Sequence, residues 1–101
     1  MRTVMVRYKT QAGRADENEA LVHAVFDELR ARAPGGLKYA TYRLADGVTF
    51  VHFATVSAAE NPLAALPAFK AFQRDIKARC VEEPVVLELT PVDAYDPEAR
   101  A

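Results

Sequence analysis

The order of hydrophobic patterns along the chain constrains its fold more than any other feature. Alternation of apolar and polar residues predicts four strands, over residues 3–9, 37–45, 48–56 and 85–90. Apolar residues at helical spacing predict one helix from Asp16 to Pro34 and a second from Pro67 to Val81. The resulting order is strand, helix, strand, strand, helix, strand.

This βαββαβ order predicts a ferredoxin-like α+β fold. Such a fold has one four-stranded antiparallel sheet with both helices on one face. Local sequence signals support the element boundaries. Asp16 with Glu19 predicts a capping box at the first helix. Asp46-Gly47 predicts a two-residue type I′ hairpin turn, and Asn61-Pro62 predicts a capped helical turn.

Length and charge limit the domain organisation and the partners. A chain of 101 residues predicts one domain, which we assign to residues 1–96, with a C-terminal tail over 97–101. The formal net charge of −1 provides no basic field for nucleic acid. Anionic membrane surfaces are disfavoured for the same reason. We therefore expect neither nucleic acid nor membrane as a partner.

The single cysteine, Cys80, excludes an internal disulfide and a cysteine zinc cluster. We place Cys80 on the apolar stripe of the second helix, in the core. The first residues show no signal-peptide pattern, and no run of about 18 apolar residues occurs. We therefore expect a cytoplasmic protein.

The two helices cover one face of the sheet, and we expect that face to be the more uniformly apolar. This criterion assigns these residues to the helices: Val4, Val6, Tyr8, Ala40, Tyr42, Leu44, Val51, Phe53, Val85, Leu87 and Leu89. The uncovered face then holds Met5, Arg7, Leu37, Tyr39, Thr41, Arg43, Val48, Phe50, His52, Ala54, Val86, Glu88 and Thr90. A two-residue loop at Asp46-Gly47 places Arg43 opposite Phe50 and Thr41 opposite His52, which agrees with this grouping.

An uncovered face of this composition exposes more apolar area than the few hundred Å² usual for a monomer. RNA is one candidate to cover it, because residues 46–53 partly resemble the aromatic third strand of RNA-recognition-motif domains. Asp46 stands where that pattern has a basic residue, however, and Val48 and Met5 replace stacking aromatics. These departures disfavour RNA.

A second subunit is the other candidate. The segments VMVRYKTQAGRADENEAL, YRLADGVTFVHFAT and LPAFKAFQRDI resemble, in order and pattern, the dimeric α+β-barrel superfamily and its antibiotic-biosynthesis-monooxygenase-like small proteins. The resemblance covers residues 3–95. It implies a homodimer packed sheet against sheet, with a pocket in each subunit between the uncovered face and the second helix.

The resemblance also implies a range of activities. Some members oxidise polycyclic phenols without metal or flavin, others degrade haem, and others isomerise or cyclise their substrates. Haem-degrading members use a tryptophan and a histidine on or near the second helix. This chain has no tryptophan, and Pro67 to Val81 contains no histidine. We therefore expect no haem degradation. We also expect no cofactor.

His52 is the first candidate for catalysis, because its near-neutral titration suits a general base that removes a phenolic or enolic proton. The alternative is a structural hydrogen bond to Thr41 at a subunit interface. Four further residues are substrate-binding candidates on the same face: Arg7, Tyr39, Phe50 and Glu88. Arg7 could hold an anionic oxygen or form an ion pair with Glu88, and Tyr39 could donate a phenolic hydrogen bond or serve as an interface aromatic.

Two positions outside this set have structural interpretations. Arg43 could stack on the ring of Phe50. His23 shares a helix face with Glu19, Asp27 and Arg30 at i,i+4 spacing, which is typical of a solvated charged face. No metal-binding pattern occurs.

Two functions remain open. The first is an apolar pocket for an aromatic or polyketide-like molecule, with cofactor-independent monooxygenation as its reaction. The second is a non-catalytic interaction or ligand-binding module whose sheet face is filled by dimerisation.

Overall fold

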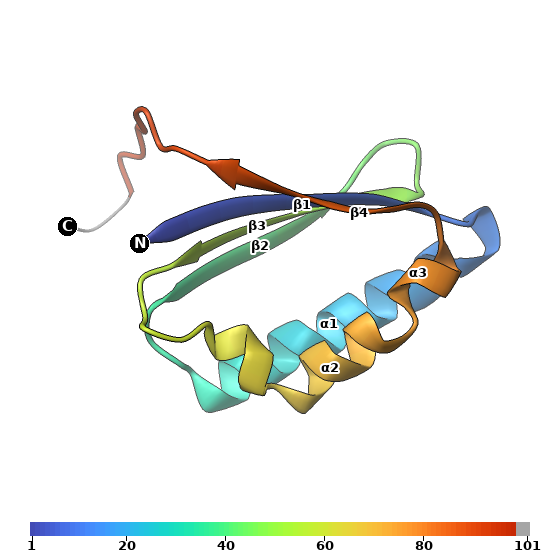
Figure 1. Ribbon diagram of the computed structural model, residues 1–101, viewed down its shortest axis with the longest axis horizontal. Coiled ribbons are helices and arrows are strands. Elements are labelled where there is room, and N and C mark those ends of the chain that lie inside the picture. The colour runs from blue at the N-terminus through green and yellow to red at the C-terminus, as the bar shows by residue number, and fades with distance from the viewer. Residues whose placement is uncertain (99–101) are drawn as a thin grey trace.

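The computed structural model describes residues 1–98 and has the predicted ferredoxin-like α+β fold (Figure 1). Its elements are β1 (Arg2–Thr10), η1 (Ala12–Arg14), α1 (Ala15–Arg32), β2 (Leu37–Arg43), β3 (Thr49–Val56), η2 (Pro62–Ala65), α2 (Pro67–Arg74), α3 (Ile76–Arg79) and β4 (Cys80–Leu89). The last three residues of the predicted tail, 99–101, lie outside the described residues. The boundary of the single domain at residue 96 stays a prediction.

The four strands form one antiparallel sheet in the order β2-β3-β1-β4. The helices lie together on one side of it, as Figure 1 shows. Thr41 pairs with His52 and Arg43 pairs with Phe50, so the predicted register of the hairpin is confirmed. The central strands β1 and β3 carry the buried aromatic residues Tyr8 and Phe50, and Leu37 and Tyr39 of β2 pack against the same core.

The predicted assignment of faces is right for β1 and wrong for the other three strands. Val6 lies opposite both His52 and Val86, so all three face the helices. Met5 lies opposite Phe53 and Leu87, which therefore share the uncovered face. Uniform apolarity was the wrong criterion, because a polar side chain can be buried wherever neighbouring strands supply its hydrogen bonds.

The predicted capping box at α1 is also wrong. The N-cap is Arg14, and no side chain caps this end of the helix. Asp16 and Glu19 instead bind Arg43 of the edge strand, with carboxylate oxygens 3.1 and 2.9 Å from Nη1. Arg43 thus leans toward α1, where these two carboxylates compensate its charge.

The hairpin loop is longer than the two residues predicted, although its register is unchanged. Gly47 N–H donates to the carbonyl of Leu44 at 2.9 Å, and Leu44 N–H donates to the carbonyl of Thr49 at 2.8 Å. Gly47 has φ 78° and Asp46 has an ordinary negative φ, so a type I′ turn is excluded. The hydroxyl of Thr49 and two backbone N–H groups donate to the Asp46 carboxylate and lower its pKa to about 2.

The second helix stops earlier than predicted. α2 ends at Arg74, α3 follows after Asp75, and β4 begins at Cys80. Cys80 is therefore a strand residue, half-buried against the core, and not part of a helical stripe. Pro84 lies in this edge strand, where the register against β1 shifts and a missing N–H is tolerated.

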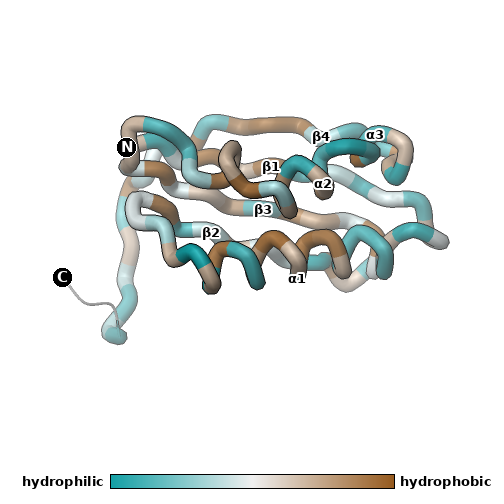
Figure 2. The backbone as a smooth tube through the Cα atoms, turned by 90° about the horizontal axis from the view of Figure 1, so that it is seen from below, coloured by the Kyte–Doolittle hydropathy of each residue, from teal (hydrophilic) through white to brown (hydrophobic). Residues whose placement is uncertain are grey.

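The core lies between the sheet and the helices. Its buried members are Tyr8, Ala15, Val22, Val25, Phe50, Leu63, Leu66 and Phe72. Figure 2 views the helices in front of the sheet and shows apolar segments in both layers. The predicted cap at η2 is confirmed, since Leu63 N–H donates to the Asn61 side chain at 3.0 Å.

Candidate functional site

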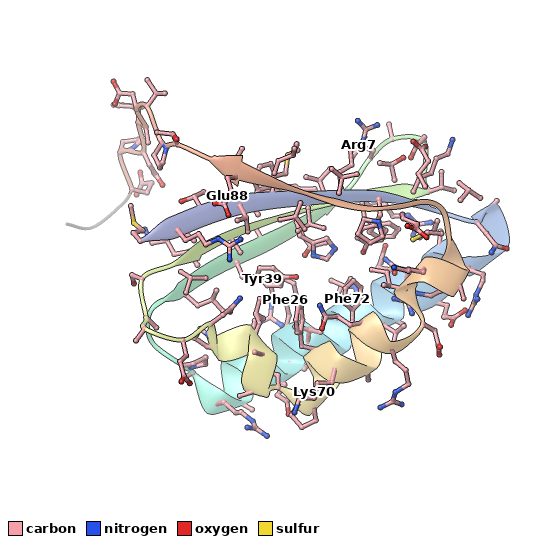
Figure 3. All side chains as sticks on the ribbon, viewed as in Figure 1. Arg7, Phe26, Tyr39, Lys70, Phe72 and Glu88 are labelled. Atoms are coloured by element: carbon pink, nitrogen blue, oxygen red, sulfur yellow. The ribbon has the colours of Figure 1, made fainter. Side chains whose placement is uncertain are left out.

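A cavity of about 330 Å³ lies between the helix-covered face of the sheet and α2. It is lined by Val4, Val6, Tyr8, Tyr39, His52, Ala54, Asn61, Leu63, Phe69, Phe72, Gln73, Ile76, Pro84 and Val86. Figure 3 shows Tyr39 and Phe72 directed into the space between the sheet and the helices. The predicted pocket on the uncovered face is thus wrong in its location, while the second helix does form one of its walls.

His52 lies in the wall formed by β3 and is only 4% exposed. Its Nε2 lies 2.7 Å from the Tyr8 hydroxyl. Its Nδ1 lies 2.7 Å from the Tyr39 hydroxyl and 2.9 Å from the Thr41 hydroxyl. Burial lowers the pKa of His52 to about 4, so the ring is neutral near pH 7.

The hydrogen bonds continue from His52 through Tyr8 to the first helix. Asn18 of α1 is fully buried, and its Nδ2 donates to the Tyr8 hydroxyl at 2.8 Å. Arg79, the last residue of α3, donates from Nε to Oδ1 of Asn18 at 3.1 Å. These four residues come from β1, β3, α1 and α3, so the chain of hydrogen bonds joins all layers of the fold.

Arg79 is a buried cation, 1% exposed, and no carboxylate among residues 1–98 forms an ion pair with it. Its Nη2 donates to the carbonyl of Phe72 at 2.7 Å. Its guanidinium carbon lies 5.3 Å from the centre of the Phe72 ring. The carbonyl, the Asn18 amide and the ring face therefore replace water around this charge.

Two of the predicted site residues, His52 and Tyr39, meet at the cavity. Phe50 is buried deeper, with its ring 5.6 Å from that of Tyr8, and it lines a separate cavity between α1 and β2. The predicted stacking of Arg43 on Phe50 is confirmed, with the guanidinium carbon 5.5 Å from the ring centre.

The structure separates Arg7 and Glu88 from this site and from each other. Arg7 pairs with Val85 in the sheet and lies exposed on the uncovered face (Figure 3). Glu88 lies on the other face and forms an exposed ion pair with Arg2 at 2.6 Å. The predicted pairing of Arg7 with Glu88 is therefore wrong, because side chains one residue out of phase point to opposite faces.

Sequence reasoning did not select Asn18 or Arg79 as site residues. The sequence did contain a signal for each. Asn18 falls between Ala15 and Val22 on the buried stripe of α1. Arg79 lies seven residues after Phe72, at the spacing of one helix face. A polar residue within an apolar stripe indicates a buried hydrogen-bond partner elsewhere in the fold.

His23 is exposed and pairs with Glu19 at 3.4 Å, so the predicted charged face of α1 is confirmed. Within residues 1–98, no group of three His, Cys, Asp or Glu side chains could hold a metal ion. No helix in that same range is long and apolar enough to cross a membrane.

The fold is the ferredoxin-like α+β fold of solved structures named antibiotic biosynthesis monooxygenases. One such structure, with a TM-score of 0.72, is 17% identical, over 92% of this chain and 100% of its own. SnoaB, a cofactor-independent oxygenase from Streptomyces nogalater in a mutant form, has a TM-score of 0.63 at 20% identity, over 96% and 97% of the two chains.

A third similar structure is a dimeric ferredoxin-like protein of unknown function from Jannaschia sp. CCS1. Its TM-score is 0.65 at 15% identity, with 89% of this chain and 98% of that chain covered. No protein-family model and no curated protein matches the sequence. At these sequence identities the similarity establishes the fold alone. The resemblance to antibiotic-biosynthesis-monooxygenase-like proteins is therefore confirmed for the fold.

Proposed function

We propose that this chain binds an uncharged, apolar aromatic molecule in the cavity beside His52 and oxidises it as a cofactor-independent monooxygenase. The observation that carries the proposal is the composition of the cavity wall. Apolar side chains make up most of it, and a hydrogen-bonded Tyr39–His52 pair supplies one polar point. Ligand sites combine these features, an apolar lining with a few placed polar groups.

The charge of the cavity favours a neutral ligand. None of the described residues that line it carries a charge, since its polar members are the hydroxyls of Tyr8 and Tyr39, two amides and the neutral ring of His52. Burial raises the pKa of Tyr39 to about 12, so its phenol stays protonated. A protonated phenol donates a hydrogen bond to a carbonyl or phenolic oxygen of the ligand.

The reaction that fits this site is oxidation of a polycyclic phenol to a quinone by dioxygen. One oxygen atom forms a carbonyl at a ring carbon, and the O–O bond breaks. The other oxygen leaves as water with the hydrogen atoms of the former C–H and O–H groups. The substrate supplies all four electrons. Tyr39 donates to the phenolic oxygen and stabilises the negative charge that develops there as the phenolic proton passes to the reduced oxygen atom that leaves as water. SnoaB, named a cofactor-independent oxygenase, supports this choice.

The test is oxygen consumption with a panel of dihydroxynaphthalenes and anthrones, with quinone formation followed by absorbance. We expect turnover by the purified protein without added metal or flavin. Tyr39→Phe is expected to lower kcat/KM about tenfold, the value of one hydrogen bond. Tyr95→Phe is the matched control, since Tyr95 lies beyond the sheet and is 90% exposed. Equal kcat/KM for the two variants would contradict a role for Tyr39.

We further propose that the uncovered face of the sheet packs against a second copy of the chain. Four large apolar residues remain exposed there, Tyr42 at 58%, Phe53 at 38%, Val85 at 55% and Leu87 at 45%. A patch of this kind marks an interaction site. The dimeric state named for the Jannaschia protein supports a homodimer.

Phe53→Glu is expected to convert the dimer into a monomer, because it places a charge at the centre of this face. Sedimentation velocity measures the outcome. Ala24→Glu adds the same charge at an exposed position on α1 and should leave the dimer intact. A wild-type protein that sediments as a monomer at high concentration would contradict the homodimer.

A non-catalytic module remains the second candidate, and the same exposed face favours it. Such a module would dimerise through this face and bind a ligand in the cavity without consuming oxygen. Saturable binding of an anthrone with no oxygen uptake would select this function.

A further inference from the structure

A series of buried hydrogen bonds runs from Arg79 through Asn18, Tyr8 and His52 to Tyr39. Arg79 determines which partner donates in each of them. A guanidinium carries only donors. The atom of Asn18 that faces Arg79 must therefore be the acceptor Oδ1, at 3.1 Å from Nε. This leaves Nδ2 of Asn18 facing Tyr8, where it can only donate to the hydroxyl oxygen, at 2.8 Å.

Tyr8 passes the same direction on to His52. Its oxygen already accepts from Asn18, so its own proton needs an acceptor. His52 Nε2, at 2.7 Å, is the acceptor that the described residues provide. Nε2 therefore carries no proton.

A neutral imidazole with an unprotonated Nε2 carries its proton on Nδ1. Nδ1–H then donates toward the hydroxyl oxygens of Tyr39 and Thr41, at 2.7 and 2.9 Å. The phenolic proton of Tyr39 is not used by His52. Tyr39 lines the cavity, so this proton is available to an acceptor atom inside it.

We propose that Asn18, oriented by Arg79, is a positioning residue that fixes His52 as the Nδ1–H tautomer and so makes Tyr39 a hydrogen-bond donor into the cavity. His52 then acts through Tyr39 and not as a base on the ligand. The donation from Tyr39 to a ligand rests on the proposed function. The tautomer of His52 does not, and it can be measured without a ligand.

The direct measurement is a long-range ¹H–¹⁵N correlation spectrum of the histidine rings at pH 8. We expect Nδ1 of wild-type His52 at the shift of a protonated nitrogen and Nε2 at the shift of an unprotonated one. His23, on the exposed face of α1, provides the reference in the same spectrum. The opposite assignment for His52 would overturn the proposal without any variant.

Asn18→Asp should reverse the hydrogen bonds that follow position 18, while Arg79 remains a donor to it. A carboxylate accepts from Arg79 and also from Tyr8, so the Tyr8 oxygen becomes free to accept from Nε2–H. The expected spectrum has the protonated and unprotonated shifts of the two His52 nitrogens exchanged, with His23 unchanged. Retention of the Nδ1–H pattern in this folded variant would show that Asn18 does not set the tautomer.

Tyr8→Phe provides a second variant if the aspartate variant does not fold. It removes the hydroxyl that donates to Nε2, so we expect the Nε2–H tautomer to be populated and the Nδ1 and Nε2 shifts of His52 to move toward each other. A spectrum identical to that of wild type would overturn the proposal. In Asn18→Asp, turnover of the dihydroxynaphthalenes and anthrones should fall about tenfold, as in Tyr39→Phe. An exchanged spectrum with unchanged turnover would refute the donation to substrate and leave the oxygenase function standing, whereas absence of turnover in wild type would refute only that function.

Discussion

Replacing Arg79 with alanine is expected to lower the free energy of unfolding by about 3 to 5 kcal/mol. The change removes a long side chain that is 1% exposed and leaves a cavity beneath α2. It also leaves the Asn18 amide oxygen and the Phe72 carbonyl without their donor. Urea unfolding followed by circular dichroism measures the difference.

Arg74→Ala is the matched control for this prediction. Arg74 ends α2 and is exposed, so its truncation should change stability by about 0.5 kcal/mol or less. Equal effects of the two substitutions would mean that the burial of Arg79 contributes nothing to stability.

Lowering the pH from 8 to 5 is expected to cost about 2 kcal/mol of stability through His52 alone. Burial lowers its pKa from 6.5 to about 4 in the folded protein. Between these two values the unfolded chain binds a proton that the folded chain does not. Stability is therefore full above pH 6.5 and falls as the pH drops toward 4.

The groups that surround His52 do not titrate in this interval. Burial raises the pKa of both Tyr8 and Tyr39, which stay protonated. His52→Gln should flatten the dependence between pH 8 and 5, because glutamine keeps a donor and an acceptor but does not ionise in this range. The same substitution at His23, which lies exposed on α1, is the matched control. Unfolding free energies at several pH values decide the matter, and an unchanged slope in His52→Gln would refute the buried neutral histidine.

Much of the fold could be predicted from local patterns. The strand and helix order, the pairing of Thr41 with His52 and the cap at Asn61 depend on residues close in sequence, and all three are confirmed. The predicted capping box is wrong because Asp16 and Glu19 form ion pairs with Arg43, on a strand distant in sequence. Charge compensation across the fold took precedence over a local helix signal.

The site itself could be predicted only in part. His52 and Tyr39 were selected for their chemistry. At the cavity, the Tyr39 hydroxyl lies 2.7 Å from Nδ1 of His52. Asn18 and Arg79 were not selected. A buried polar residue is recognised by its hydrogen-bond partner, and only the packing of the helices brings these partners together. The same dependence on partners explains how His52 can be buried: Tyr8, Tyr39 and Thr41 supply its hydrogen bonds from two other strands.

By itself, the sequence determined the element order, the hairpin register and which residues of β2 and β3 share a face. Only the tertiary structure decided which of the two faces lies under the helices. The hairpin ties β2 to β3, but no tight turn ties β1 to β3, so the phase between Val6 and His52 is set by packing. Both faces carry enough apolar surface to be buried, and the helices fill the one whose polar groups the neighbouring strands can satisfy.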